Sequence, residues 1–146
     1  MKLLDYTGKL NTHQEYLDIL DKIEPKCQYI EIVITFGNKS NDIVENFKDD
    51  ILESRKVSEW WGTITKGKNN LYKIKSSKKL FDYLKQYETF CKYYFYGSNA
   101  ETLSRGDYSE ITDFGSDDIA FYDKNNNLLL FTTTHEGYIT INEIIL

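Results

Sequence analysis

Apolar positions in the first quarter of the chain follow two different periods. Thr12 and Glu15 have the spacing of a capping box, and apolar residues then recur at helical intervals as far as Pro25. Residues 28–36 are instead β-branched and aromatic, and they end at Gly37. The pattern therefore predicts an amphipathic helix of about three turns followed by a largely buried strand.

The central part of the chain predicts a second helix and a hairpin. Helical spacing returns from Asn41 or Asp42 and continues through Leu52, so the second helix is expected to end before Arg55. Two extended stretches, residues 57–65 and 71–74, then flank the turn-forming residues Lys66 to Asn70. This arrangement is typical of a β-hairpin.

A third helix and a series of strands complete the expected elements. Ser76 or Ser77 can cap this helix, and its apolar face is formed by Leu80, Phe81, Leu84 and Tyr87. Residues 90–96 fit either a continuation of the helix or a strand, and their tyrosines favour a strand. Four further strands are expected at residues 108–114, 119–123, 128–134 and 138–141, with turns at 124–127 and 135–137.

The order and length of these elements predict one globular domain over residues 1–146. A chain of 146 residues can bury a sizeable core. We expect the α+β class, with a mainly antiparallel sheet and about three helices packed on one face. No stretch approaches the roughly 18 apolar residues of a membrane span, and the N-terminus lacks the apolar core of a signal peptide. The protein is therefore expected to be cytoplasmic, with no membrane partner and with reduced thiols.

Charge is unevenly distributed along this single domain. Residues 1–54 carry a net charge of −5, residues 55–92 carry +7 and residues 93–146 carry −7, which gives −5 for the whole chain. Clustered charge steers association with charged partners. The pattern therefore favours a binding role, without naming the partner.

One phosphate-binding motif is incomplete. Gly62, Gly67 and Lys68 have the spacing of a P-loop, but Asn69 stands where serine or threonine would ligate magnesium. A P-loop also needs a helix N-terminus directly after it, whereas residues 71–74 are extended in character. We interpret the glycines as part of a hairpin turn.

The residue types that catalysis and metal binding use are sparse. His13, His135, Cys27 and Cys91 have no metal-ligand spacing between any two of them, so we expect neither a metal nor a cofactor. A small enzyme stays an alternative, with its site around His135 and Glu136 and with Cys91 as a further candidate. Such a site requires these residues to converge in one cleft.

A basic strip provides a second alternative. Residues 66–79 contain six lysines, and the nearby Trp60, Trp61 and Tyr72 could stack on bases. The whole chain is nevertheless acidic, with a pI of about 5.1, whereas nucleic-acid-binding domains are usually basic. Nucleic acid is therefore the less favoured partner.

Four stretches carry a family resemblance: Val57 to Thr63 with its tryptophan pair, Phe90-Cys91, residues 118–123 and residues 134–137. In these stretches the chain resembles small Gram-positive immunity proteins of bacterial polymorphic-toxin systems. The resemblance implies a cytoplasmic protein without catalysis. Such a protein binds the toxic domain of a related system and blocks its active site.

The acidic C-terminal part fits that implication. Many intercellular toxins are nucleases with basic clefts, in which acidic groups can take the place of phosphates. Tyrosine and tryptophan dominate binding hot spots, so aromatic residues near the acids are the expected anchors. The expected partner-binding residues are Trp60, Trp61, Asp107, Tyr108, Glu110, Asp113, Asp117, Asp118, Tyr122, Asp123, His135 and Glu136.

Overall fold

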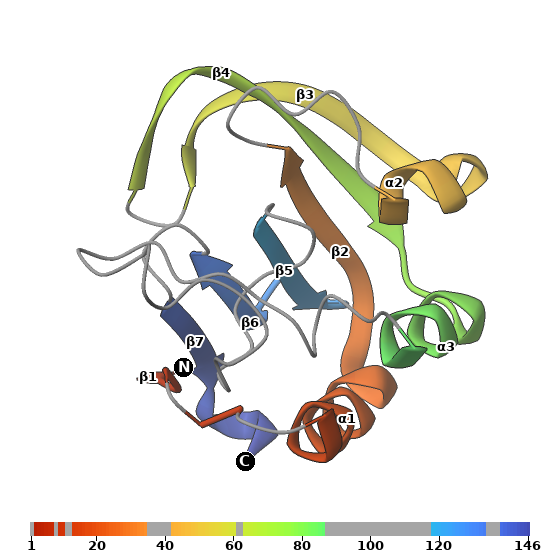
Figure 1. The fold of residues 1–146 in the computed structure, drawn as a ribbon, viewed down its shortest axis with the longest axis vertical. Coiled ribbons are helices and arrows are strands. Elements are labelled where there is room, and N and C mark those ends of the chain that lie inside the picture. The colour runs from red at the N-terminus through yellow and green to blue at the C-terminus, as the bar shows by residue number, and fades with distance from the viewer. Residues whose placement is uncertain are drawn as a thin grey trace.

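The computed structural model describes residues 2–7, 9–10, 13–34, 42–60, 63–86, 118–133 and 138–146. These residues form a seven-stranded antiparallel sheet and three α-helices (Figure 1). The expected α+β class and the mainly antiparallel sheet are thereby confirmed. The elements in chain order are β1 (Leu3–Asp5), α1 (His13–Ile23), β2 (Cys27–Ile34), α2 (Asp42–Asn46), β3 (Ile51–Trp60), β4 (Thr63–Lys75), α3 (Lys78–Gln86), β5 (Asp118–Asp123), β6 (Leu128–Thr133) and β7 (Tyr138–Asn142).

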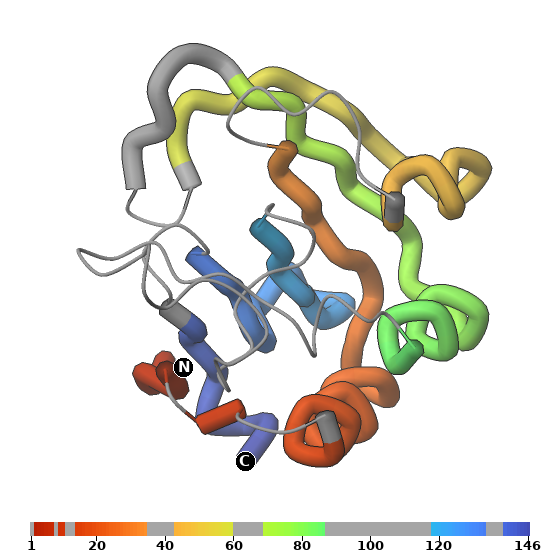
Figure 2. Tube along the Cα trace, in the orientation of Figure 1, coloured from red at the N-terminus to blue at the C-terminus, as the bar shows by residue number. Residues whose placement is uncertain are grey.

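The strand order of the sheet is β1-β7-β6-β5-β2-β4-β3. Strand β2 lies in the middle and pairs with both β4 and β5. The sheet is strongly curved, and the β3–β4 hairpin arches over the top of the view in Figure 1. In Figure 2, the path from the N-terminus begins beside β7, close to the C-terminus, as the β1–β7 pairing requires. The short β1 was not expected from the sequence.

One row of apolar residues runs across the whole sheet. The strand registers place one residue from each strand side by side in this row: Leu4, Ile141, Leu130, Phe121, Ile30, Ile74 and Ile51. All seven belong to, or pack against, the larger buried cluster. Burial of such a row supplies most of the driving force that holds the seven strands together.

Buried residues of all three helices join this same cluster. In α1, Tyr16 and Leu20 are almost fully buried, and in α3 Leu80 and Phe81 are fully buried. The expected apolar faces are therefore confirmed over the described residues of these two helices, whereas Tyr87 lies outside them. The Tyr16 hydroxyl donates a hydrogen bond of 2.6 Å to the carbonyl of Leu84, which joins α1 to α3 inside the core.

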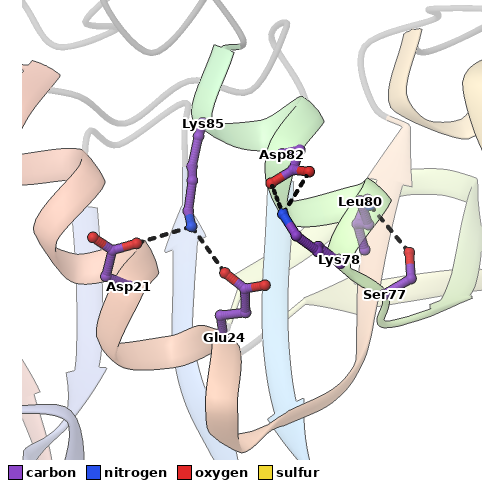
Figure 3. Close-up of polar contacts among 7 residues, drawn as sticks. All are labelled: Asp21, Glu24, Ser77, Lys78, Leu80, Asp82 and Lys85. Atoms are coloured by element: carbon purple, nitrogen blue, oxygen red, sulfur yellow. Dashed lines mark hydrogen bonds and ion pairs between the residues drawn. The ribbon is translucent and has the colours of Figure 1, made fainter.

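Polar contacts at the ends of α1 and α3 fix how these two helices meet (Figure 3). The Ser77 hydroxyl accepts a hydrogen bond from the Leu80 N–H at 3.0 Å, so Ser77 caps α3 as expected. From the last turn of α3, the Lys85 ammonium contacts carboxylates of Asp21 and Glu24, each at 2.8 Å. Hydrogen bonds to Asp21 and then to Glu24 raise the pKa of Lys85 above its usual value. Both carboxylates thus favour the charged form of this ammonium.

The expected second helix is much shorter than its apolar spacing suggested. Helix α2 ends at Asn46, a short 3₁₀ turn follows at Lys48–Asp50, and β3 begins at Ile51. Ile51 has helical spacing from Phe47, but it lies opposite Ile74 in the sheet and packs in its apolar row. The prediction of a helix through Leu52 was wrong because the same apolar residue also suits the start of a strand.

The turn of the central hairpin also lies elsewhere than expected. Trp60 is paired with Thr63, so the chain reverses between these two residues and not at residues 66–70. Thr63 to Lys75 form one long strand. The expected strands at 28–36, 119–123, 128–134 and 138–141 are confirmed over their described residues, whereas those at 90–96 and 108–114 lie outside the described residues.

Candidate functional site

The β3–β4 hairpin extends beyond the rest of the sheet. Residues 70–75 of β4 pair with β2 on one side, whereas Thr63, Ile64 and Asn69 pair with β3 and have no partner in another described strand. In Figure 1 this outer part of the hairpin follows the arch at the top of the view and turns downward at the upper left. The backbone of Trp60 takes part in the last described pair, so one of the two predicted tryptophan anchors lies at the far end of the hairpin.

A bulge interrupts the outer part of β4. Val57 of β3 is paired with Asn69 of β4, and the next pair is Glu59 with Ile64. Between these two pairs β4 therefore contains more residues than β3. The additional residues include Gly67, whose lack of a side chain suits a bulge. Gly67 thus lies in a bulge, and Asn69 and Asn70 are paired residues of β4, so this stretch is not the predicted turn. Because Gly67 and Lys68 lie within a strand, they cannot form the phosphate-binding loop whose spacing they share.

Strand β3 is exposed along most of its length. It is the outermost of the described strands, and residues 52–56, 58 and 59 are all exposed. Leu52 is 57% exposed, which is unusual for a large apolar residue in a sheet. The Arg55 guanidinium contacts the Glu53 carboxylate at 2.7 Å and the less exposed Glu31 carboxylate at 3.7 Å. The edge is therefore charged, with both signs present.

The face of the sheet opposite the helices carries a second buried cluster, which contains Tyr29 and Tyr122. The two rings stack with centroids 4.9 Å apart, and the Lys73 ammonium lies 4.2 Å from the centroid of the Tyr29 ring. The Tyr29 hydroxyl donates to Oδ1 of Asn126 at 2.9 Å. Desolvation and the nearby Glu31 carboxylate raise the pKa of Tyr29. These contacts join β4, β2 and β5 to the β5–β6 turn.

Three of the predicted partner-binding residues have described side chains. Asp118 is only 4% exposed, and Tyr122 is 9% exposed and stacked on Tyr29. Asp123 lies at the end of β5, where its carboxylate organises the following turn. The remaining predicted residues lie outside the described residues or have only a described backbone: Trp60, Trp61, Asp107, Tyr108, Glu110, Asp113, Asp117, His135 and Glu136.

The turn between β5 and β6 confirms the expectation for residues 124–127. Asp123 accepts hydrogen bonds from the backbone of Asn125 and Asn127 and from the Asn127 side chain, at 2.8, 2.9 and 3.1 Å. Asn126 has a φ of 65°, a left-handed conformation that asparagine tolerates. Partial desolvation acts to raise the pKa of Asp123, but the hydrogen bonds from Asn127 and Asn125 outweigh it and hold this pKa below its usual value.

Replacement of Asp123 by alanine is expected to lower the free energy of unfolding by about 1–2 kcal/mol at pH 7. Because the carboxyl has a lowered pKa in the folded protein, its contribution is present above the unfolded pKa of about 3.9 and is lost as pH falls through the folded pKa. Urea unfolding of both proteins at pH 7 and near pH 2.5 measures this loss. The difference should shrink at the lower pH, and a difference independent of pH would contradict the assigned role.

A shallow depression of about 460 Å³ lies beside this turn, lined by Asp123, Asn127, Asn142, Glu143 and Ile144. Its polar groups are largely used by the chain itself. Nδ2 of Asn142 donates to the Leu128 carbonyl, and Oδ1 of Asn142 accepts from the Ile144 N–H. These contacts give the lining residues a structural role.

The residues of the enzyme alternative are only partly described. Cys91, His135 and Glu136 lie outside the described residues. Burial raises the pKa of the Cys27 thiol to about 11, and its Sγ donates to the Tyr29 carbonyl at 3.4 Å. Cys27 is therefore a protonated, poorly nucleophilic thiol at neutral pH.

The described lysines of the basic strip do not share one face. Lys73 lies over Tyr29, which belongs to the cluster opposite the helices. Lys79 lies on α3, 5.9 Å from the ring centroid of Phe47, which belongs to the helix-side cluster. A continuous nucleic-acid surface would require these lysines to lie together.

Sequence reasoning missed the edge position of β3, which is the most exposed element of the site. The charged and small polar residues that dominate the stretch from Glu53 to Glu59 are the signal that could have indicated it, because edge strands carry such residues. Helical spacing around Phe47 concealed this signal.

Within the described residues, no helix combines the length and apolar character needed to cross a bilayer. Nor do three or more histidine, cysteine or acidic side chains gather there as a metal site would require. Comparison of the chain with family models, curated proteins and solved structures finds no match in any of the three.

Proposed function

We propose that this protein is a cytoplasmic, non-catalytic binding protein that acts as an immunity protein. Its partner is the toxic domain of a cognate toxin, basic and nuclease-like, and binding blocks the active site of that domain. The acidic C-terminal part supplies the charge, and the tryptophans of the β3–β4 hairpin supply aromatic contacts. No cofactor takes part.

The observation that carries the proposal is the hairpin itself. A two-stranded projection that runs beyond its sheet and has Trp60 in its last described pair offers aromatic side chains a position from which to enter a cleft. Tryptophan combines a large contact area with little loss of conformational entropy on binding. These properties are those of a binding anchor.

Charge supports the proposal independently. Residues 93–146 carry a net charge of −7, and a basic partner would be attracted to them over a distance of about one Debye length, roughly 8 Å at physiological salt. Attraction of this kind accelerates association more than it slows dissociation. An inhibitor that must act before a toxin reaches its substrate benefits from fast association.

The test is association with the toxic domain encoded beside the gene, first by co-expression and then by stopped-flow kinetics. Replacement of Asp107, Glu110 and Asp113 by lysine is expected to slow association by about tenfold at low salt and to weaken its salt dependence. Asp118 is left unchanged because it is buried, so its reversal would disturb the fold.

Control variants change the net charge elsewhere. Asp18 on α1 and Glu45 on α2 are both exposed, and their replacement by lysine should leave the association rate nearly unchanged. Equal rates for all of these variants, or no complex with the neighbouring toxic domain, would contradict the proposal.

A further inference from the structure

The outer edge of β3 is able to pair with another strand. No strand among the described residues pairs with this edge, and β3 contains no proline. Exposed edge strands present backbone N–H and C=O groups to any complementary strand. The charges on β3 restrict which strands can pair, because like charges that lie directly opposite each other are destabilising.

A second copy of β3 could pair antiparallel only in a few registers. Residues directly opposite each other in antiparallel strands point to the same face of the sheet. In a symmetric dimer, the twofold axis that relates the two β3 strands must therefore pass between a residue and the same residue of the second copy. An axis at Glu53, Arg55 or Lys56 would place two like charges opposite each other. These three registers are thereby disfavoured.

An axis at Ser54 gives complementary charges. Glu53 then lies opposite Arg55 of the second copy, and Arg55 lies opposite its Glu53. Within each chain these two side chains already contact each other at 2.7 Å. The four charged groups would form a square in which each group has an opposite charge on both sides.

The same register accounts for the exposed Leu52. Leu52 lies at the register shift between Ile51 and Glu53, next to the position that would face Lys56 of the second copy, whose methylene groups can cover an apolar side chain while the ammonium stays in water. An axis at Val57 also pairs Arg55 with a glutamate, Glu59, but it places Leu52 beyond the end of the opposing β3.

The geometry points to a homodimer in which the β3 strands of two copies of this chain pair antiparallel, with Ser54 on the twofold axis. The two sheets then form one continuous sheet across the dimer. This inference does not rest on the proposed toxin partner. It concerns the side edge of β3, whereas the toxin contact uses the hairpin end and the acidic segment.

Sedimentation velocity of the full chain, from micromolar to millimolar concentration, tests the dimer directly. Arg55→Glu replaces the alternating square by four carboxylates and should raise the dimer dissociation constant by about tenfold or more. The double variant Glu53→Arg, Arg55→Glu restores the alternation and should restore the dimer. With an axis at Val57 the double variant would not recover, because Glu59 would then face a glutamate. Thermal melts of each variant confirm that the monomer folds.

Disulfide formation provides a second measurement. In a Cys91→Ser background, Ser54→Cys places two thiols on residues with Cβ atoms about 4.5–5.5 Å apart, so a covalent dimer should form under mild oxidation. Ser58→Cys is the matched control on the same exposed strand, because its two copies would lie about 26 Å apart.

Three results would overturn the inference. They are a monomer at all concentrations, a dimer that Arg55→Glu leaves unchanged, and equal cross-linking through Ser54→Cys and Ser58→Cys. A monomer whose β3 amides become protected from hydrogen exchange only when the toxic domain is added would assign this edge to that partner instead.

Discussion

Replacement of Phe121 by alanine is expected to lower the free energy of unfolding by about 3–5 kcal/mol. Phe121 is 1% exposed, lies at the centre of the apolar row across the sheet, and has its ring centroid 6.0 Å from that of Phe81 on α3. Removal of its ring deletes contacts to two layers of the core and leaves a cavity that the neighbouring strands cannot close. A total stability of about 5–15 kcal/mol would be reduced by a large fraction.

Urea unfolding followed by circular dichroism measures this loss. Leu52→Ala is the matched control, because Leu52 is a large apolar residue of the same sheet that is 57% exposed. Its removal should change the stability of the monomer by no more than about 0.5 kcal/mol. A loss below about 1 kcal/mol for Phe121→Ala would show that this row does not form the core.

Alanine at both Trp60 and Trp61 is expected to weaken the complex with the toxic domain by about 2–4 kcal/mol, which is about 30-fold to 1000-fold in the dissociation constant. The expectation rests on the proposed function. Tryptophan side chains can bury far more area in a partner than short polar side chains, and Trp60 lies in the last described pair of the hairpin. Most of the change should appear in the dissociation rate.

Titration calorimetry of the wild-type and variant proteins with the toxic domain measures the effect. Phenylalanine at both positions keeps a large aromatic side chain and should recover part of the affinity. The unfolding midpoint serves as the control for folding. A dissociation constant within about threefold of the wild-type value would show that the hairpin end is not part of the interface. The acidic segment would then be the remaining candidate contact.

Several elements could be predicted because their signals are local. The capping box at Thr12 and the helical spacing up to Pro25 predicted α1, and Ser77 with Leu80, Phe81 and Leu84 predicted α3. The β5–β6 turn followed from its run of asparagines, one of which has a positive φ. In each case the residues that determine the structure lie within a few positions of one another.

The errors arose where a local pattern had two solutions. Ile51 suits either a third helical turn or the first position of a strand, and its pairing with Ile74 in the apolar row decides for the strand. Gly67 suits either a turn or a bulge, and the pairing of Trp60 with Thr63 decides for the bulge. Both decisions depend on contacts between residues far from these local windows.

The acidic residues of the candidate site could not be sorted from the sequence into exposed and buried ones, because burial also depends on distant contacts. A sequence shows charge but not exposure, so Asp118 and Asp123 counted equally as surface acids. In the structure Asp118 is buried, and the hydrogen bonds of Asp123 organise a turn. Trp60 and Trp61 were selected by residue type, whereas the place of Trp60 at the end of a hairpin follows from strand pairing.

The sequence alone determined the α+β class, the antiparallel character of the sheet, two of the three helices and the segregation of charge, because periodicity and composition encode them. Tertiary structure alone decided the strand order, the edge position of β3 and the direction in which its charges point. These properties depend on which strands meet. That choice is made by the burial of one apolar row, from Leu4 to Ile51, whose members are distributed along nearly the whole chain.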